Sequence, residues 1–285
     1  MRAVILIRRI AHRAFVAACV LIAGVTTPLV ASAGAVLLPM SGLSAPADHP
    51  DLDWAGSQIR IHEQAGPGPR GVQTPSANWL RGFDVSSHQP GVDFRRAAAG
   101  GARFAYVKAT EGTSYINPSF AQQYNGAFDA GLIRGAYHFA LPNRSSGKAQ
   151  ADYFIGHGGG WSRDGRTLPP MLDIEYNPYG ATCYGLSASA MAGWVRDFAT
   201  EVHTRTGRWP TIYTSTSWWH QCTGDRVDLA TQDPLFVARY AGQPGPLPSR
   251  WTYWTFWQYS DSGSLPGDQD YFDGSQERLR ALANG

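Results

Sequence analysis

The sequence predicts an α/β fold, a single-domain closed (β/α) barrel, and three observations support that prediction. Short apolar runs typical of strands alternate with helical patterns from Trp79 to the C-terminus. Alternation repeated this often indicates a parallel sheet with helices outside it. About seven strands within roughly 205 residues fit a closed barrel better than an open sheet. Glycine-rich dinucleotide motifs do not follow the first of these strands, so a nucleotide-binding fold is disfavoured.

The elements of this barrel can be placed in order along the chain. The expected strands are residues 82–85, 104–108, 135–139, 171–175, 211–214, 235–238 and 255–259. The expected helices cover residues 93–99, 120–128, 149–156 and 191–202, where apolar side chains recur with helical spacing. Gly131 and Gly207 follow two of these helices and suit their C-terminal ends.

The first 33 residues have the pattern of a secretory signal peptide. Four arginines precede an apolar stretch over residues 14–30, and Ala31-Ser32-Ala33 offers a small-residue cleavage site. Gly24, Pro28 and the shortness of the stretch disfavour a membrane anchor. We therefore expect a secreted, extracellular protein without stable membrane association once the signal is removed.

Residues 34–78 are expected to form a poorly ordered leader or linker before the barrel domain, residues 79–285. The segment is punctuated by Pro, Gly and Ser and shows no sustained periodicity. Residues 51–63 are the only part of it with a pattern that suits docking onto a folded domain.

The charge balance excludes a nucleic-acid-binding surface. The whole chain has 24 Lys and Arg against 22 Asp and Glu, and the signal peptide holds four Arg and no acid. The remainder therefore carries 20 basic against 22 acidic residues, and it lacks a basic stripe.

The cysteines indicate a disulfide, and the histidines do not indicate a metal site. Cys19 leaves with the signal peptide, so Cys183 and Cys222 remain as an even pair in an exported protein. The eight histidines are scattered and lack the H-E-x-x-H pattern of zinc hydrolases. His88 and His138 lie near strand ends, where we favour a hydrogen-bonded structural role. We expect neither a metal nor another cofactor.

The segment "MLDIEYNPYG" carries the strongest chemical signal. Asp173 and Glu175 are two residues apart on an expected strand, so their side chains face the same side while Ile174 faces away. They lie at the carboxyl end of the strand, where barrel active sites are built. Two carboxylates about 7 Å apart raise one another's pKa, so one can act as a general acid while the other stays ionised. Glycosidic bond cleavage uses this division of roles.

Other expected strand ends add residues to the same place. Asp84 ends the first strand, and Asp268, Asp270 and Asp273 come directly after the last one. Because the first and last strands of a closed barrel are neighbours, we expect these acids to meet the central pair. Several tyrosines at the same rim suit the apolar faces of sugars, although core packing is an equal alternative for each: Tyr137, Tyr176, Tyr213, Tyr240 and Tyr259.

Taken together, these segments resemble the glycoside hydrolase family 25 lysozymes, the Chalaropsis-type N-acetylmuramidases. The resemblance covers residues 81–285 and is carried in one order by "GFDVSSHQ", "FAYVKATEGTSYINPSF", "GAYHF", "LDIE", "CYGLS", "TIYTSTSWW", "PLFVARY", "WTFWQYSDSG" and "DYFDG". It is strongest to secreted actinomycete members. It implies an irregular (β/α) barrel that hydrolyses the β-1,4 bond between N-acetylmuramic acid and N-acetylglucosamine in peptidoglycan. We expect a monomer by default.

The resemblance also implies roles for individual residues. Glu175 matches the proton donor, Asp173 the acid that stabilises the reacting centre, and Asp84 the acid after the first strand. Asp268 matches the acid of the C-terminal segment, but Asp270 stands where Asn is common, so the choice between these two stays open. Gln258 joins Tyr137, Tyr176, Tyr213 and Tyr240 as the expected substrate-binding set. Cys183 and Cys222 fall where similar secreted members carry a disulfide.

Two questions stay open at the level of the sequence. The resemblance suggests a retaining reaction, in which the N-acetyl group of the substrate attacks and Asp173 stabilises the resulting oxazolinium. An inverting reaction would instead need Asp84 or Asp268 to activate a water molecule. The alternative function is a non-catalytic peptidoglycan-binding barrel, which would keep the aromatic residues but has no need of the paired acids.

Overall fold

The computed structural model describes residues 52–63, 76, 78–248 and 250–285. All of them belong to one compact unit, Gly42–Gly285. The predicted signal peptide, residues 1–33, lies outside the described residues, as do residues 34–51, 64–75 and 77 of the predicted leader. The boundaries proposed for these two segments therefore stay predictions.

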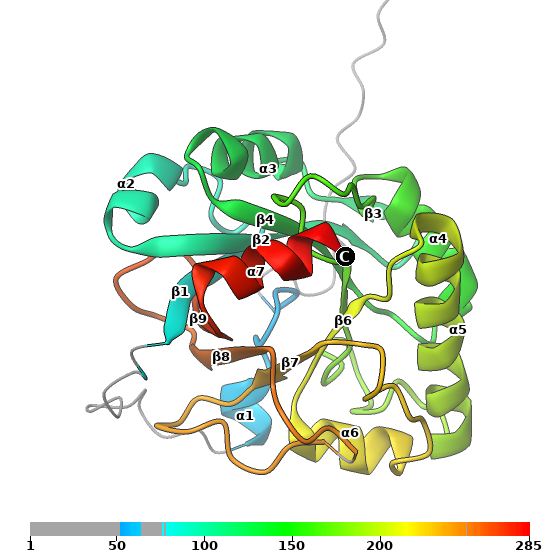
Figure 1. Ribbon diagram of the computed structural model, residues 1–285. Coiled ribbons are helices and arrows are strands. Elements are labelled where there is room, and N and C mark those ends of the chain that lie inside the picture. Colours follow the sequence, from blue (N-terminus) through cyan, green and yellow to red (C-terminus); the bar gives the residue numbers. More distant parts are fainter. Residues whose placement is uncertain (1–51, 64–75, 77, 249) are drawn as a thin grey trace, which may run out of the picture. The chain divides into compact units, whose positions relative to one another are not determined.

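Eight strands form a closed barrel, which confirms the predicted fold class (Figure 1). They are β1 (Trp79–Val85), β2 (Ala102–Glu111), β4 (Ile133–Phe139), β5 (Met171–Asp173), β6 (Thr211–Thr214), β7 (Leu235–Ala238), β8 (Phe256–Ser260) and β9 (Asp268–Asp273). β1 pairs with β2 on one side and with β9 on the other, which closes the barrel. A short ninth strand, β3 (Tyr115–Ile116), pairs only with the end of β2.

β9 makes the barrel irregular. It runs antiparallel to both β8 and β1, whereas the other barrel strands pair in parallel. The seven predicted strands did not include this one, because residues 268–273 form an eighth barrel strand that lies between β8 and β1. Gly267 makes the turn into β9 with φ +56°, and a side chain there would overlap the Asp84 carbonyl oxygen.

The four predicted helices are present outside the barrel. They are α2 (Phe94–Ala99), α3 (Phe120–Asp129), α4 (Gly147–Gly156) and α5 (Ala188–Thr206). Side chains of Asp93, Ser146 and Ser187 cap the first turns of α2, α4 and α5. Gly207 ends α5 in the left-handed conformation, as predicted. α4 and α5 lie side by side (Figure 1).

Three helices were not predicted from the sequence. α1 (Ile59–His62) precedes the barrel, α6 (Thr216–Thr223) follows β6, and α7 (Gln276–Asn284) ends the chain. Ser215 and Ser275 cap α6 and α7, so the capping signal was present although the segments are short. Within the described part of the chain, no helix has the length and apolar character needed to span a bilayer.

Aromatic side chains fill the barrel interior below its carboxyl-end mouth. Phe104 of β2 lies 5.1 Å from Phe256 of β8, and Phe256 lies 5.2 Å from Phe236 of β7, measured between ring centroids. Each buried ring of this size contributes about 1.5–3 kcal/mol of hydrophobic stabilisation. These rings close the interior, so the polar side chains at the carboxyl ends of the strands lie above an apolar floor.

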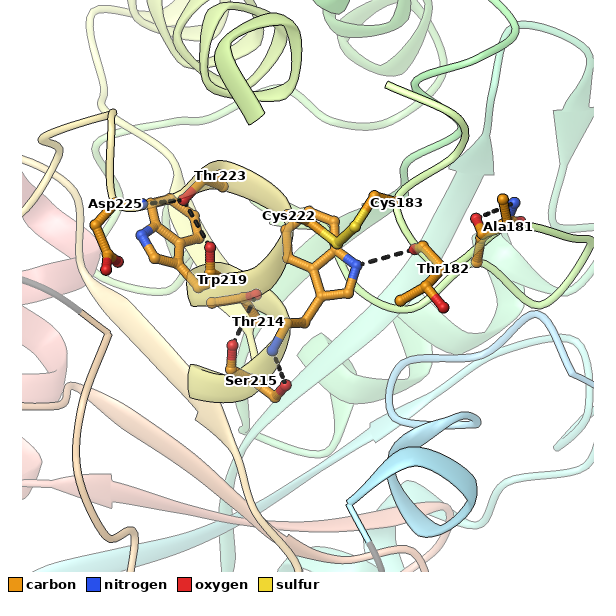
Figure 2. Close-up of a disulfide and its surroundings, with 11 residues drawn as sticks. Ala181, Thr182, Cys183, Thr214, Ser215, Trp219, Cys222, Thr223 and Asp225 are labelled. Atoms are coloured by element: carbon orange, nitrogen blue, oxygen red, sulfur yellow. Dashed lines mark hydrogen bonds between the residues drawn. A yellow bond between two sulfur atoms is a disulfide. The ribbon is translucent and has the colours of Figure 1, made fainter. Parts of the chain in front are cut away.

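The predicted disulfide is confirmed. Cys183, in the loop after β5, is bonded to Cys222 of α6, with 5.2 Å between their Cα atoms (Figure 2). Trp218 of α6 also donates its indole N–H to the Thr182 carbonyl oxygen at 3.2 Å. Two linkages therefore hold this loop against α6 next to the strand that carries Asp173.

Candidate active site at the carboxyl end of the barrel

The four predicted acids lie on two opposite sides of the mouth, because β2 and β4 separate β1 from β5 in the barrel. Asp173 is the last residue of β5 and Glu175 follows two residues later. Asp84 of β1 pairs directly with Asp268 of β9 in the antiparallel register. All four side chains are buried, with at most 5% of their surface exposed. The irregular strand β9 therefore brings the C-terminal acid beside the N-terminal one, which an all-parallel barrel with a loop at this position would not do.

Gln258 of β8 links these acids to the predicted substrate-binding residues. Its Nε2 donates to Asp84 Oδ2 at 2.9 Å and to Asp268 Oδ2 at 3.1 Å. Its Oε1 accepts from the Tyr213 hydroxyl at 2.7 Å and from the Tyr240 hydroxyl at 3.1 Å. Two acids and three of the predicted substrate-binding residues therefore form one hydrogen-bonded network.

Burial sets the protonation of the acids. It raises the pKa of Glu175 to about 8, although a backbone N–H bonded to this carboxyl acts in the opposite direction. Burial also raises the pKa of Asp84 to about 7, opposed by the hydrogen bond from Gln258. The pKa of Asp173 is raised well above its usual range by burial and then by the neighbouring Glu175. Near neutral pH, Glu175 thus keeps the proton that a general acid must supply.

Asp268 and Asp270 both point into the barrel, because they are two residues apart on one strand. Asp268 accepts a hydrogen bond from Gln258, whereas Asp270 has no nitrogen or hydroxyl donor among the described residues and faces the Asp84 carboxyl. Burial and the nearby Asp84 raise the pKa of Asp270 well above its usual range. Asp273 lies apart from this group at the far end of β9, where it accepts from the Trp79 indole N–H at 3.0 Å.

The predicted aromatic residues divide into two groups. Tyr137 of β4 is fully buried, and the charges of Asp84, Asp173 and Asp268 contribute to its raised pKa, so it lies among the acids. Tyr176 directly follows Glu175 and stacks on His62, with 4.2 Å between ring centroids. Tyr259 does not join them. It stacks on Tyr271 at 4.5 Å, on the opposite face of β8 from Gln258.

Sequence reasoning missed a buried cation beside the acids. Lys108 of β2 is one of only two lysines in the chain, and it is fully buried. Its Nζ lies 2.6 Å from Glu111 Oε2, and the Tyr179 hydroxyl donates to Glu111 Oε1 at 2.6 Å. The charge of Lys108 lowers the pKa of both Asp173 and Glu175, against the effect of burial. A lysine inside the apolar strand "FAYVKATE" is the signal that could have identified it.

The mouth is occupied by residues 52–63 from the predicted leader. The peptide group between Ala55 and Gly56 lies between two of the predicted site residues. Gly56 N donates to Glu175 Oε1 at 2.7 Å, and the Ala55 carbonyl oxygen accepts from Gln258 Nε2 at 2.9 Å. The one patch of the leader that the sequence marked as suited to docking therefore lies on the candidate active site.

The two histidines near strand ends have hydrogen-bonded roles. His138 Nδ1 lies 2.8 Å from the Thr110 hydroxyl and its Nε2 lies 2.9 Å from Gln150 Oε1. His88 Nε2 lies 2.7 Å from Asp53 Oδ1. Over residues 52–63, 76, 78–248 and 250–285, His, Cys, Asp and Glu side chains do not form a group of three or more that could hold a metal ion.

Comparisons with known proteins agree with this geometry. The family model of glycosyl hydrolases family 25 matches residues 83–268. The N,O-diacetylmuramidase of a Chalaropsis species is 51% identical over 210 residues, which are 72% of this chain and 100% of that protein. Lysozyme M1 of Streptomyces globisporus is 44% identical over 280 residues, 94% of each chain.

Solved structures extend the similarity to three dimensions. A family GH25 lysozyme from Aspergillus fumigatus has a TM-score of 0.72 and 51% identity, covering 73% of this chain and 100% of that one. The lysozyme of Streptomyces coelicolor has a TM-score of 0.70 and 50% identity, covering 72% of this chain and 97% of that one.

Proposed function

We propose that this chain, which belongs to glycosyl hydrolases family 25, is a lysozyme that hydrolyses the β-1,4 bond between N-acetylmuramic acid and N-acetylglucosamine in peptidoglycan. The observation that carries the proposal is the pair of carboxyl groups on Asp173 and Glu175, two residues apart at the carboxyl end of a barrel strand. With residues 52–63 in place, burial raises the pKa of Glu175 to about 8, which is the direction that a general acid needs. This arrangement supports an enzyme over the alternative of a non-catalytic peptidoglycan-binding barrel, which has no need of a general acid.

The proposed reaction uses the two acids of the "LDIE" segment in different roles. Glu175 donates its proton to the glycosidic oxygen as the bond to the anomeric carbon breaks. The N-acetyl oxygen of the substrate attacks that carbon, and Asp173 stabilises the positively charged oxazolinium that forms. Water then opens this intermediate, with Glu175 accepting the proton, so the configuration is retained. Both oxygens of Asp173 lack a partner among the described residues, so they can accept the acetamido N–H.

The other residues hold and shape the site. Asp84 and Asp268, bridged by Gln258, fix the polar wall opposite the acid pair. Tyr137, Tyr176, Tyr213 and Tyr240 contribute rings and hydroxyls that suit a sugar. We also propose that the protein acts outside the cell as a monomer and needs no cofactor. The Cys183–Cys222 disulfide supports an oxidising compartment.

The proposal is tested by identifying the reducing sugar that the protein creates. Purified peptidoglycan is digested with the chain 34–285 and with the barrel alone, 76–285, and the products are reduced with borohydride and identified by mass spectrometry. Muramitol is expected, and NMR of the same digest should show the β-anomer first. Glu175→Gln should lower the rate by at least about 100-fold, because general acid catalysis contributes that much. Glu277→Gln, an exposed acid on α7, is the matched control and should leave the rate unchanged.

Three outcomes would count against parts of this proposal. Glucosaminitol in place of muramitol would reject the bond specificity. An initial α-anomer would reject the retaining route. Binding to peptidoglycan without any new reducing end, for both chains, would favour the non-catalytic alternative.

A further inference from the structure

Residues 52–63 cover the acids that the proposed reaction needs. Asp84, Asp173, Glu175 and Asp268 are at most 5% exposed with this segment in place. The peptide group between Ala55 and Gly56 bonds both Glu175 and Gln258, and the Gly56 carbonyl oxygen accepts from the Tyr240 hydroxyl at 3.1 Å. A peptide group is a secondary amide, as is the acetamido group of an N-acetylated sugar. The segment therefore presents the chemistry of the substrate to the residues that would bind the substrate.

The N-terminal part of the segment is anchored by a buried ion pair. Asp53 is 1% exposed, and its Oδ2 lies 3.2 Å from Lys108 Nζ. Lys108 also donates to the Asp53 carbonyl oxygen, and His88 contacts the other carboxylate oxygen. Coulomb attraction between buried charges is only weakly screened by salt. Lys108 thus belongs both to the wall of the site and to the anchor of the segment.

The C-terminal part, α1, is held by apolar burial and by three polar contacts. Ile59 is fully buried and belongs to the main hydrophobic core. The Arg60 guanidinium forms a two-pronged ion pair with Asp261. His62 stacks on Tyr176, and Glu63 Oε1 accepts from the Tyr176 hydroxyl at 3.1 Å. Figure 1 shows α1 as the short blue helix.

The fit around Gly56 admits no side chain. Gly56 has φ +91°, and a Cβ atom there would overlap the Tyr240 hydroxyl and Gln258 Oε1 and lie 2.8 Å from the Tyr213 hydroxyl. All three of these groups belong to the predicted substrate-binding set. Steric complementarity as well as charge therefore holds the segment in the site. Gly56 packs closely against the residues that would contact a sugar.

From these contacts we propose that residues 52–63 are an intramolecular inhibitor, which occupies the substrate position and must be displaced before a glycan chain can bind. The inference rests on the proposed function and deepens it. The segment does not satisfy every polar group of the site. Both carboxyl oxygens of Asp173 and Oε2 of Glu175 find no hydrogen-bond partner among the described residues. Leaving buried carboxyl oxygens unsatisfied costs free energy, so a glycan that satisfies them competes favourably. The segment holds its place because it is covalently attached, which gives it a high effective concentration at the site.

We expect the barrel to fold without this segment, because a relative that lacks an equivalent length of chain has the same fold. The A. fumigatus lysozyme is matched over 100% of its length and covers 73% of this chain, so it consists of little more than the barrel. A chain 76–285 is therefore a suitable reference for the fully active state.

The test compares rates of reducing-end release from solubilised peptidoglycan. The chain 34–285 carries Gly56→Leu or Ile59→Asp, each of which should eject the segment without touching the barrel wall. Both variants, like the chain 76–285, are expected to be at least tenfold faster than the unmodified chain 34–285. Ile61→Asp is the matched control, because Ile61 lies on the same helix but is 63% exposed, and its rate should equal that of the unmodified chain.

A second measurement separates failure of the inference from failure of the proposed function. A fluorescent peptide of residues 52–63 is titrated into the chain 76–285, and its Gly56→Leu version should bind at least tenfold more weakly. Equal rates of reducing-end release for all chains would overturn the inhibitor role. Equal affinities of the unmodified and Gly56→Leu peptides for the chain 76–285 would overturn it as well. Binding that depends on Gly56, to a barrel that leaves peptidoglycan intact, would overturn the proposed function and the inhibitor role with it.

Discussion

A single amide side chain positions the polar wall of the site. Gln258 donates to Asp84 and Asp268, which face each other directly across β1 and β9. Two carboxyl groups opposite each other on neighbouring strands disfavour each other's ionisation, and a donor between them offsets part of that repulsion. The two tyrosine hydroxyls that donate to Gln258 Oε1 fix the orientation of the amide. The role of Gln258 is therefore to position and tune the acids.

Methionine has a length similar to that of glutamine but no amide. Replacing Gln258 with methionine should therefore separate the effect of its hydrogen bonds on the pKa of Asp84 from the effect of its packing. The hydrogen bond from Gln258 lowers the pKa of Asp84, so its loss should raise that pKa above about 7. If Asp84 acts in its ionised form, the acidic limb of the kcat/KM profile of the chain 76–285 should move to higher pH. The free energy of unfolding should fall by about 1–3 kcal/mol, because buried acceptors lose their donor.

The matched control for this variant is Gln269→Met. Gln269 is also a buried glutamine, on the neighbouring strand β9, but its amide bonds the backbone of Leu265 and Gly267. Its replacement should lower stability and leave the pH profile unchanged. An acidic limb that stays in place in Gln258→Met, or that moves equally in both variants, would contradict the positioning role.

Single residues differ in how far the sequence could place them. The pairing of Asp173 and Glu175 at the carboxyl end of β5 was predictable, and both are buried, as is Ile174. The predicted strand 171–175 was too long, because β5 ends at Asp173 and Glu175 lies in the segment that follows it. Lys108 was harder to place, although its position in an apolar strand marks it, because its partner Asp53 is 55 positions away and reaches it only by tertiary packing. Its other partner, Glu111, is three positions along the same strand. The contact between Gly56 and Glu175 joins residues 119 positions apart, which no local pattern encodes.

At the scale of elements, β9 shows why a strand can be hidden in a sequence. Its residues, "DQDYFD", contain three acids, and acids are depleted in strands and enriched in turns. Hydrogen bonding to β8 on one side and β1 on the other compensates for this low propensity. The parallel strands were easier to predict, because their buried positions are mostly apolar. The strand that carries Asp268 and Asp270 was therefore missed, although both acids were named as candidates from the sequence.

The disulfide stabilises the region between β5 and α6, and its removal gives a prediction for that element. Cys183 and Cys222 are 39 positions apart, and closing a loop of that length in the unfolded chain corresponds to about 4 kcal/mol in the chain-entropy treatment. The double variant Cys183→Ser with Cys222→Ser should lose up to that amount in urea unfolding. The barrel should persist, because the Trp218–Thr182 hydrogen bond and the buried face of α6 remain.

The reduced wild-type chain provides the control for this comparison. Reduction with dithiothreitol should lower the stability of the wild-type chain to that of the double variant and leave the variant unaffected. A loss below about 1 kcal/mol would mean that the loop is already restricted in the unfolded chain and that the disulfide is dispensable for stability.

At the scale of the whole molecule, the fold buries several carboxyl groups and raises their pKa. Burial raises the pKa of Asp233 from 3.8 to about 8 and that of Glu175 from 4.5 to about 8, and it also raises those of Asp84, Asp173, Asp268 and Asp270. Asp233 lies far from the mouth, in a cavity of about 280 Å³ beside the start of β7. Near neutral pH the folded chain therefore binds protons, on Asp233 and Glu175 for example, that the unfolded chain does not bind.

This difference in bound protons fixes how stability depends on pH. Where the folded chain binds more protons than the unfolded chain, unfolding releases protons, so stability falls as pH rises. Between about pH 4.5 and 8, Asp233 and Glu175 are protonated in the folded chain and ionised in the unfolded chain. His138 acts in the opposite sense, because burial lowers its pKa from 6.5 to about 3, and stability is lost as pH falls through that range. Above pH 6.5 His138 is neutral in both states, so only the buried acids contribute among these groups.

We therefore expect the free energy of unfolding to fall steadily from pH 6.5 to pH 8, by up to about 1.4 kcal/mol per pH unit for each proton held. Urea unfolding at half-unit intervals of pH measures this slope. Asp233→Asn keeps the size of the side chain and removes one titrating group, so it should make the slope shallower by up to that amount while leaving the active-site acids intact. A flat or rising stability from pH 6.5 to 8, or an unchanged slope in Asp233→Asn, would show that these carboxyl groups ionise within the folded chain.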